Sequence, residues 1–251
     1  MSDSINKFKK ISLILPAFNV QNIIGNAVKL AEKEIKKVNP QEYEIIVVDD
    51  GSFDSTWNEL KELKNIYGDR LRIIHLSKNS GKGNAIKKGI SLSQGDIVGF
   101  IDSDLDIVPE NIPIFLNYFK ENRADILIGS KRHPESKINY PKRRLFLSNL
   151  FNLVVKIIFR INLSDTQTGI KFFKKDLADS ILRKTKCKRY IFDLEFLLIA
   201  LKNEWRIVEY PVIIEYRKKQ KRINLFEIFN AIIEIGKVFF YLKLKKYDKL
   251  F

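Results

Sequence analysis

The chain alternates between short apolar runs and longer segments in which apolar residues recur every three or four positions. The short runs predict five strands in the first half, at residues 11–15, 43–48, 71–76, 97–101 and 125–128. The segments between them predict helices at residues 23–37, 54–67, 82–92 and 109–122. Because strands and helices alternate, we expect an α/β fold with a mainly parallel sheet flanked by helices.

The second half is less regular. It predicts helices at residues 145–161, 192–201 and 225–244, and short strands at 170–173 and 206–210. The first and last of these helices are apolar but interrupted by charged residues, which is typical of helices that pack on a core or lie in a membrane interface. We expect one domain over residues 1–222 and an amphipathic C-terminal helix and tail over 223–251, associated with a membrane surface.

Polar clusters follow the predicted strands at the points where the strands end. They lie at residues 16–19, 49–52, 77–83 and 102–106. The carboxyl ends of parallel strands meet at one edge of a sheet, and ligands of such sheets bind there. The sequence therefore predicts a binding site at this edge.

Three acidic residues end the fourth strand at every second position, namely Asp102, Asp104 and Asp106. Their mutual repulsion is offset if they hold a hard divalent cation such as Mg²⁺ or Mn²⁺, which prefers oxygen ligands. The alternative is a turn at the strand end with solvated acids.

Two further clusters suit a nucleotide. Asp50 follows the second strand, although an Asp-Gly turn alone explains part of this segment. Lys82 lies in a glycine-rich stretch that opens a helix, where a phosphate can bind. As a dinucleotide fingerprint the stretch is incomplete, because Ile86 stands where a third glycine belongs.

The composition adds a net charge of +15 over 251 residues. This charge favours anionic surroundings such as phosphorylated substrates, an anionic membrane face or nucleic acid. Codon bias is a simpler explanation for part of the lysine content. Because no aromatic-rich RNA motif accompanies the charge, we expect no nucleic-acid partner. A single cysteine suits a reducing compartment, and the first ten residues lack the pattern of a signal peptide.

Taken together, the motifs resemble family 2 glycosyltransferases of the GT-A fold. The segments that carry this resemblance occur in the family's order and are PAFN (16–19), VVDDGSFD (47–54), GKGNAI (81–86) and DSD (102–104). In the second half, GSKR (129–132), SDTQTGIKFF (164–173) and RYIFDLEFLLIA (189–200) look like polyprenyl-phosphate sugar transferases, above all dolichyl-phosphate β-glucosyltransferases and then dolichyl-phosphate mannose synthases. The resemblance extends over residues 11–216 and makes residues 1–222 the catalytic domain.

The resemblance implies a role for each matching residue. The donor-binding set would be Pro16, Ala17, Asn19, Asp50, Lys82, Asp102, Ser103 and Gln167. Asp102 and Asp104 would bind the metal with help from Asp106. The acceptor phosphate would be held by Lys131, Arg132, Arg144 and Ser148, and the catalytic set would be Asp165, Asp104 and Arg144. Lys131 replaces an arginine of the family and Thr168 replaces a cysteine.

The function implied is metal-dependent transfer of a hexose, with glucose favoured, from a nucleotide sugar to a polyprenyl phosphate. A phosphate acceptor is already ionised near neutral pH, so the reaction needs no strong base. We expect a single displacement with inversion, in which Asp165 orients the acceptor or the sugar.

Several alternatives remain open from the sequence. A hydroxyl acceptor on a cell-envelope glycan would need a base, and Asp165 or Asp193 would have to serve. The motifs do not separate UDP-glucose from GDP-mannose, dolichyl from undecaprenyl phosphate, or Mg²⁺ from Mn²⁺, and they give no oligomeric state. The basic segments KINYPKRR (137–144) and YRKKQKR (216–222) are either solvated loops or contacts to anionic lipid. We expect a cytoplasmic protein, peripheral on the cytoplasmic face of a membrane.

Overall fold

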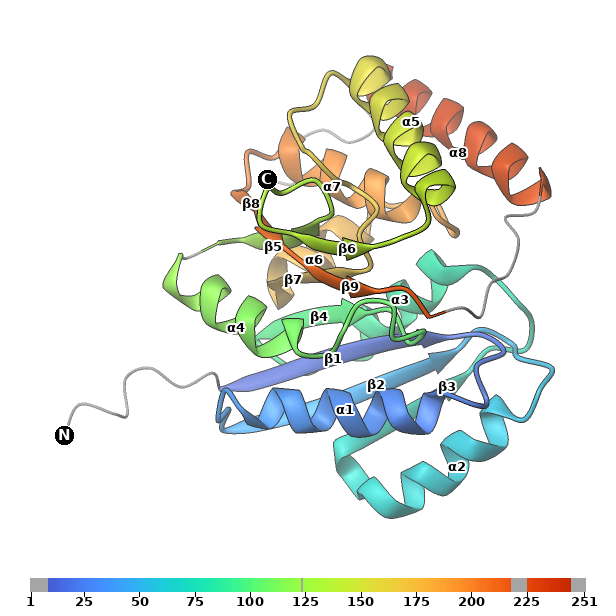
Figure 1. Cartoon of the computed structure of the whole chain (residues 1–251), viewed down its shortest axis with the longest axis vertical. Coiled ribbons are helices and arrows are strands. Elements are labelled where there is room, and N and C mark those ends of the chain that lie inside the picture. Colours follow the sequence, from blue (N-terminus) through green and yellow to red (C-terminus); the bar gives the residue numbers. More distant parts are fainter. Residues whose placement is uncertain (1–8, 123, 218–224, 245–251) are drawn as a thin grey trace.

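A computed structural model of the chain describes residues 9–122, 124–217 and 225–244. Its centre is one seven-stranded sheet with helices on both faces (Figure 1). In spatial order the strands are β3 (Leu71–His75), β2 (Glu42–Asp49), β1 (Lys10–Ala17), β4 (Ile97–Ile101), β7 (Ile170–Lys174), β5 (Ile126–Ser130) and β8 (Ile207–Pro211). Only β7 is antiparallel to its neighbours, so the α/β fold with a mainly parallel sheet is confirmed.

The register of the first strands aligns their carboxyl ends. Ala17 of β1 pairs with Asp49 of β2, and Asp49 pairs with His75 of β3. In β1 and β2 the residues before these ends are mostly apolar and buried on both faces of the sheet, as in Leu13 and Val47, which are fully buried. Polar residues therefore begin at the same edge of the sheet on adjacent strands.

The helices form two layers around the sheet. One core packs the sheet against α3 (Lys82–Leu92), α6 (Lys175–Leu182) and α7 (Phe192–Lys202). The other packs it against α1 (Ile24–Lys36), α2 (Thr56–Tyr67) and α4 (Asn111–Glu121). A short 3₁₀ helix, η1 (Gly68–Arg70), leads from α2 into β3.

Two long helices, α5 (Lys142–Phe159) and α8 (Leu225–Lys243), lie side by side at one end of the molecule (Figure 1). The rings of Phe159 and Phe239 join them, with centroids 6.3 Å apart. Val155 of α5 and Val238 of α8 are fully buried in the core that contains α3 and α7. None of the helices in the described part of the chain is long and apolar enough to cross a membrane.

The predicted strands and helices are all present, with small shifts at their ends. Helix α2 begins at Thr56, and Asp54 accepts a hydrogen bond from the Thr56 N–H (3.0 Å), although the residue at the N-cap position is Ser55. The sequence analysis missed α6 and the small parallel sheet of β6 (Lys137–Asn139) and β9 (Ile213–Glu215). These two strands have three residues each, which is too short for a recognisable period.

Candidate functional site

The first-half motifs meet at the carboxyl edge of the sheet through hydrogen bonds between loops. The Ser103 hydroxyl donates to the Pro16 carbonyl (2.7 Å), and the Asp50 N–H donates to the Ala17 carbonyl (2.8 Å). Asn19 has a left-handed backbone (φ 52°), and its side-chain oxygen accepts the Phe53 N–H (3.0 Å). The loops after β1, β2 and β4 therefore form one connected surface.

Asp50 supports the glycine-rich turn before α3. Its two carboxylate oxygens accept the N–H groups of Ser80 and Gly81, each at 2.8 Å. Burial raises the pKa of Asp50 despite these hydrogen bonds. Gly81 has φ 101°, and a Cβ there would overlap Arg189, so both backbone and space require glycine. Asp50 thus shapes the turn, and its contact with a base or ribose stays a prediction.

Asp102, Asp104 and Lys82 form a compact charged group. Lys82 Nζ lies 2.5 Å from Asp102 Oδ1. Burial lowers the pKa of Lys82, but the negative charges of Asp102 and Asp193 outweigh it and the pKa is raised. Asp104 reaches solvent, yet loss of water on its protein side, together with Asp102 and Asp106, raises its pKa to about 6. Desolvation is the larger cause of this raised pKa, and repulsion between the carboxylates adds to it.

Asp106 points away from this pair. Its Oδ2 lies 2.9 Å from Arg144 Nη1, and its Oδ1 accepts the Arg217 N–H (3.1 Å). Leu105 has φ 60°, an uncommon backbone conformation for leucine, and is buried at the bend between the two aspartates. Among the described residues no three carboxylate, histidine or cysteine side chains converge on one point. In this arrangement Asp106 is held by Arg144, as Asp102 is held by Lys82, so the help that Asp106 would give to a metal stays a prediction.

Asp102 and Asp104 suit a hard divalent cation. Asp102 and Asp104 offer carboxylate oxygens on one loop, and a bound cation would favour the ionised form of Asp104, which burial and the neighbouring carboxylates disfavour. Mg²⁺ commonly uses one or two carboxylates and takes its other ligands from water and substrate phosphates. The two aspartates fit that pattern. Lys82 lies beside Asp102 and supplies a positive charge for a phosphate.

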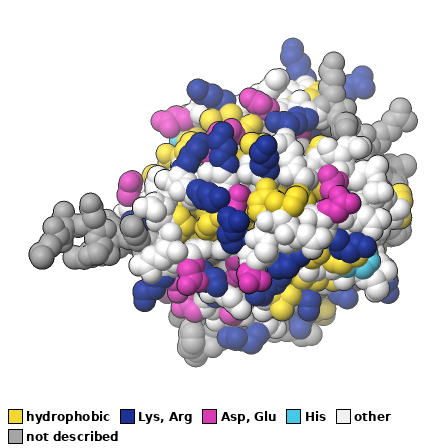
Figure 2. Space-filling model, turned by 90° about the horizontal axis from the view of Figure 1, so that it is seen from below, with side chains coloured by type: hydrophobic (Ala, Val, Ile, Leu, Met, Phe, Trp, Pro, Cys, Tyr) yellow, Lys and Arg dark blue, Asp and Glu magenta, His cyan; other side chains and the backbone are white. Residues whose placement is uncertain are grey.

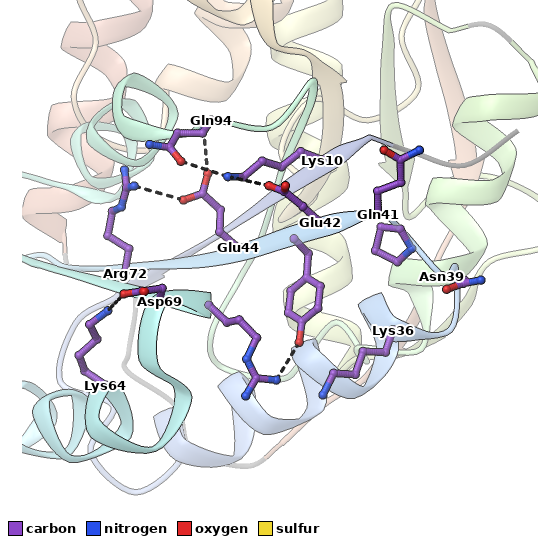
Figure 3. Close-up of a pocket in the computed structure, with 13 residues that line it drawn as sticks. Lys10, Lys36, Asn39, Gln41, Glu42, Glu44, Lys64, Asp69, Arg72 and Gln94 are labelled. Atoms are coloured by element: carbon purple, nitrogen blue, oxygen red, sulfur yellow. Dashed lines mark hydrogen bonds and ion pairs between the residues drawn. The ribbon is translucent and has the colours of Figure 1, made fainter. Parts of the chain in front are cut away.

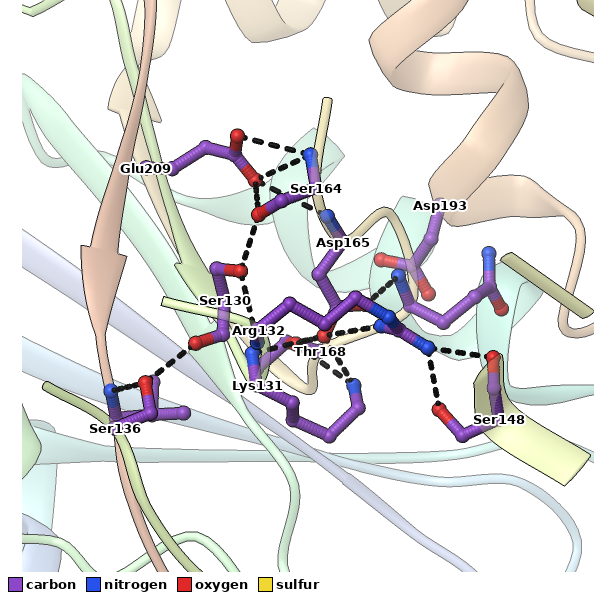
Figure 4. Close-up of polar contacts among 12 residues, drawn as sticks. Ser130, Lys131, Arg132, Ser136, Ser148, Ser164, Asp165, Thr168, Asp193 and Glu209 are labelled. Carbon is purple, nitrogen blue, oxygen red and sulfur yellow. Dashed lines mark hydrogen bonds and ion pairs between the residues drawn. The ribbon is translucent and has the colours of Figure 1, made fainter. Parts of the chain in front are cut away.

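The second half contributes a basic cluster built on Asp165 (Figure 4). Asp165 is 1% exposed, and its Oδ2 is 2.7 Å from Lys131 Nζ and 3.2 Å from Arg132 Nη1. The same oxygen accepts the Thr168 hydroxyl (2.6 Å) and the Lys131 N–H (3.0 Å). Asp165 Oδ1 accepts the Gln167 N–H (3.0 Å). One carboxylate thus aligns two cationic side chains.

These contacts decide the ionisation of Asp165. Burial alone would raise its pKa, but Lys131, Thr168 and Arg132 overcome that effect and lower the pKa to about 2. The carboxylate therefore stays ionised throughout the physiological range. A group with so low a pKa and so many donors is a poor proton acceptor, so Asp165 suits an orienting role rather than that of a general base.

Helix α5 connects the basic cluster to the acidic loop. Arg132 Nη2 donates to the carbonyl of Ser148 (2.6 Å) and to its hydroxyl (3.1 Å). Arg144, one helical turn earlier, binds Asp106 and packs against the ring of Tyr140 (4.1 Å). The residues expected at an acceptor phosphate are Lys131, Arg132, Arg144 and Ser148. Helix α5 carries Arg144 and Ser148 and contacts Arg132, while Lys131 joins Arg132 through Asp165.

Two features of the site escaped the sequence analysis, which named Asp193 only as an alternative base. Lys171 and Asp193 form a buried ion pair (2.7 Å) beside Lys82. A Cβ on Gly169 would overlap the Asp102 carboxylate, so glycine is needed for close packing there. The charges of Lys171 on an apolar strand and Asp193 on an apolar helix were the available signal, because such charges are seldom buried unless paired.

Gln167 has a free donor at this site. Its Nε2 is buried and makes no hydrogen bond with any described residue. A buried donor without a partner costs free energy, which a ligand oxygen could recover. This supports the expected position of Gln167 near a sugar.

A separate pocket opens at the opposite, amino edge of the sheet (Figure 3). Its charges largely pair with each other, as in Lys10 with Glu42 (3.3 Å) and Lys64 with Asp69 (3.7 Å).

On the face drawn in Figure 2, lysine and arginine side chains are interspersed with acidic ones. A continuous basic surface, as nucleic-acid binding requires, is not seen on that face.

Comparison with known proteins gives consistent matches. The sequence profile of "Glycosyl transferase family 2" matches residues 12–182. The chain is 33% identical to dolichyl-phosphate beta-glucosyltransferase of Homo sapiens over 76% of this chain and 63% of that protein. It is 30% identical to dolichyl-phosphate beta-glucosyltransferase of Dictyostelium discoideum over 80% of this chain and 65% of that protein. It is 26% identical to glycosyltransferase AglD of Haloferax volcanii over 81% of this chain and 32% of that protein. The chain thus spans less than two thirds of each of these curated relatives.

Solved structures show the same fold. Glucosyl-3-phosphoglycerate synthase from Mycobacterium tuberculosis in complex with UDP superposes with a TM-score of 0.67 at 19% identity, over 95% of this chain and 80% of that one. A complex of the same enzyme with Mn²⁺, UDP and glucosyl-3-phosphoglycerate gives 0.62 at 18% identity, with the same coverage. With a family profile that spans most of the sheet and both halves of the site, the chain belongs to glycosyltransferase family 2.

Proposed function

We propose that this chain transfers a hexose, with glucose favoured, from a nucleotide sugar to a polyprenyl phosphate. UDP-glucose is the leading donor and GDP-mannose the next, and the acceptor is dolichyl or undecaprenyl phosphate. Two relatives named dolichyl-phosphate beta-glucosyltransferase support this reaction. The fold neighbour was crystallised with UDP-glucose and phosphoglyceric acid, so a related fold accommodates a nucleotide sugar beside a phosphate-bearing acceptor.

The observation that carries the proposal is the state of Asp165. Its Oδ2 meets Lys131, Arg132 and Thr168, and its pKa is lowered to about 2. The alternative base, Asp193, forms an ion pair with Lys171, whose Nζ lies 2.7 Å from Asp193 Oδ1. A hydroxyl acceptor needs a proton acceptor, whereas a phosphate is already ionised at neutral pH. The charge pattern therefore favours a phosphate acceptor over a hydroxyl.

The acidic loop supplies the donor half. Asp102 and Asp104 would hold Mg²⁺ or Mn²⁺, which neutralises the diphosphate leaving group when bound. Lys82 adds a positive charge next to Asp102, where phosphate oxygens would meet it. The unpaired Nε2 of Gln167 is available to a sugar hydroxyl. We propose inversion by direct displacement, because the buried carboxylates Asp165 and Asp193 are each paired with a lysine, which makes them poor nucleophiles.

The basic cluster supplies the acceptor half. Lys131 and Arg132 are held in place by Asp165, and Arg132 is also bound to Ser148. Arg144 lies one turn from Ser148 on α5, with its guanidinium between Asp106 and Tyr140. A phosphate would join cations that are already oriented, so little ordering cost remains on binding.

The outer faces of α5 and α8 suit a membrane surface. Most of the large apolar side chains exposed in the described residues lie on these two helices. On α5 they are Phe146, Leu147, Leu150, Leu153, Val154 and Ile157, and on α8 Ile232, Ile233, Phe239 and Phe240, with Leu244 directly after its end. Exposed Lys142 and Arg143 begin α5, and each cation near an anionic surface contributes about 1 kcal/mol. Much of the basic segment 216–222 lies outside the described residues.

We propose that the protein works as a peripheral protein on the cytoplasmic face. The acceptor's phosphate lies at the membrane surface, and the cations on α5 belong to the same helix as the exposed apolar stripe. That arrangement would bring the acceptor phosphate to the site without extracting its lipid chain.

Purified protein, Mg²⁺ or Mn²⁺, a panel of radiolabelled nucleotide sugars and a short polyprenyl phosphate provide the test. Label in the organic phase that disappears with Asp104→Ala would support a metal-dependent lipid-phosphate transferase and identify the sugar. Donor hydrolysis without organic-phase label from any sugar would overturn the acceptor assignment and favour a hydroxyl acceptor on a cell-envelope glycan.

A further inference from the structure

Glu209, on strand β8, anchors the loop that carries Asp165. Its carboxylate accepts the Ser164 N–H at 2.9 Å from both oxygens and the Ser164 hydroxyl at 2.6 Å. It also accepts the Asp165 N–H (3.1 Å). Among the described residues no lysine or arginine pairs with Glu209, so its contacts serve the loop rather than a charge (Figure 4).

Two routes lead from Glu209 to the basic cluster. The first passes through the backbone of Asp165 to its Oδ2, which contacts Lys131 and Arg132. In the second, the Arg132 N–H donates to the Ser130 hydroxyl (3.2 Å), which lies 2.5 Å from the Ser164 hydroxyl. Because the Ser164 hydroxyl donates to Glu209, the Ser130 hydroxyl must donate to Ser164. Every hydrogen bond in this series therefore has its acceptor on the side of the Glu209 carboxylate.

We infer that Glu209 is a positioning residue for the acceptor phosphate, acting through Ser164 and Asp165 on Lys131 and Arg132. This inference rests on the proposed function for the identity of the acceptor. It adds a residue of β8, outside the loops that carry the motifs, to the machinery of the site. The register supports it, because β8 pairs with β5 directly before the loop of Lys131: Ile128 lies opposite Glu209, and Ser130 opposite Pro211.

Glu209→Gln makes a sharp test, because the change in shape is minimal. Both carboxylate oxygens now face the Ser164 N–H, so the glutamine amide would place an N–H₂ group against that donor. The loop must then shift or lose a hydrogen bond. Ser130→Ala is the second variant, since it interrupts only the hydroxyl route to Arg132.

Glu44→Gln is the matched control. Like Glu209, Glu44 is a carboxylate that accepts a serine hydroxyl (Ser12, 2.7 Å) and a backbone N–H (Gln94, 2.7 Å). It lies near the amino edge of the sheet, in the pocket of Figure 3, away from the basic cluster. A loss of fold stability alone would affect both glutamine variants in the same way.

The readouts are the KM for a short polyprenyl phosphate at saturating donor, the KM for the donor, and binding of inorganic phosphate by calorimetry. For Glu209→Gln we expect a roughly tenfold higher acceptor KM and weaker phosphate binding, as for one lost hydrogen bond to a charged group. Ser130→Ala should change both readouts in the same direction and by less. The donor KM should stay the same in both, and Glu44→Gln should change only the melting temperature.

The outcomes separate this inference from the proposed function. Unchanged acceptor KM and phosphate binding in Glu209→Gln and Ser130→Ala would overturn the positioning role. If Glu209→Gln does not fold, Ser130→Ala decides alone. If the wild type makes no lipid product but binds phosphate in a Lys131-dependent way, the proposed function fails while the binding readout still decides the role of Glu209. A wild type that binds no phosphate would overturn both.

Discussion

Arg144 Nη1 and Asp106 Oδ2 lie 2.9 Å apart, and this ion pair joins helix α5 to the loop that carries Asp102 and Asp104. The two residues are 38 positions apart in the sequence. The guanidinium also packs against Tyr140 at 4.1 Å and Tyr216 at 5.5 Å. The cation expected at the acceptor is therefore fixed by a residue first expected at the metal.

Removing this pair should affect acceptor binding more than stability. Arg144→Ala should raise the acceptor KM about tenfold, while the unfolding free energy falls by about 1 kcal/mol, since the pair is partly exposed. Arg143→Ala, the exposed neighbour with the same charge, is the control and should leave the KM for a short, detergent-soluble acceptor unchanged. Equal effects of the two variants would argue for general charge attraction instead.

Asp104 should make metal binding depend on pH. Its pKa of about 6 in the fold lies above the ordinary 3.8, so the protein binds an extra proton between these values. The metal-free fold therefore loses stability from this group as pH rises from about 4 to 6, and Mn²⁺ competes with the proton in the same range. We expect Mn²⁺ affinity to increase through pH 6 and to level off above it, measured by calorimetry.

Asp104→Asn provides the comparison for that curve. The variant should bind Mn²⁺ weakly and without the rise near pH 6. A wild-type affinity that is constant between pH 5 and 7 would remove Asp104 from the metal site.

Asp165→Asn should weaken the alignment of Lys131 and Arg132 rather than remove a base. Because the variant leaves two cations next to a neutral buried amide, a loss of about 3–5 kcal/mol of unfolding free energy is expected. The pKa of Asp165 is depressed to about 2, so its stabilising effect is present above about pH 4 and is lost as pH falls toward 2.

Kinetics distinguish the two roles of Asp165. An increased acceptor KM with residual turnover supports alignment. Abolished turnover with donor and acceptor binding intact would instead indicate a chemical role.

Gly169→Ala should damage the metal site through one methyl group. The added Cβ would overlap the Asp102 carboxylate, which has to move or turn. We expect weaker Mn²⁺ binding with the overall fold retained, as seen by circular dichroism. Gly236→Ala on α8 is the control, because no atom lies within 4 Å of its added Cβ. Wild-type metal affinity in Gly169→Ala would show that Asp102 is not a ligand.

A single charge on the apolar face of α5 should release the protein from vesicles. Ile157 is 67% exposed on α5, and Ile66 is 73% exposed on α2, away from the proposed membrane surface. Ile157→Asp should lower cosedimentation with vesicles containing anionic lipid, and Ile66→Asp should not. Equal binding of both variants would exclude α5 as the contact, and loss of binding at high salt alone would indicate a purely electrostatic association.

The sequence predicts the strands and helices of the first half of the chain well, because the pattern within each segment is enough to identify it. Strand β4 and helix α3 have the expected bounds, since a buried β-branched run and a glycine-led amphipathic segment are unambiguous. The antiparallel insertion of β7 between β4 and β5 was not predicted, because a five-residue apolar run carries no information about its direction. The partners of Asp106 and Asp165 likewise depend on how distant loops meet.

The sheet order also sets a sequence of events during synthesis. Strands β1 to β4 pair with one another, whereas β5 pairs only with β7 and β8 and has no hydrogen bonds to β4. β5 therefore has no place in the sheet until the ribosome has delivered Ile170–Lys174. A nascent chain would order the proposed donor residues of its first half before the proposed acceptor cations, so a product truncated before β7 would lack the aligned cations.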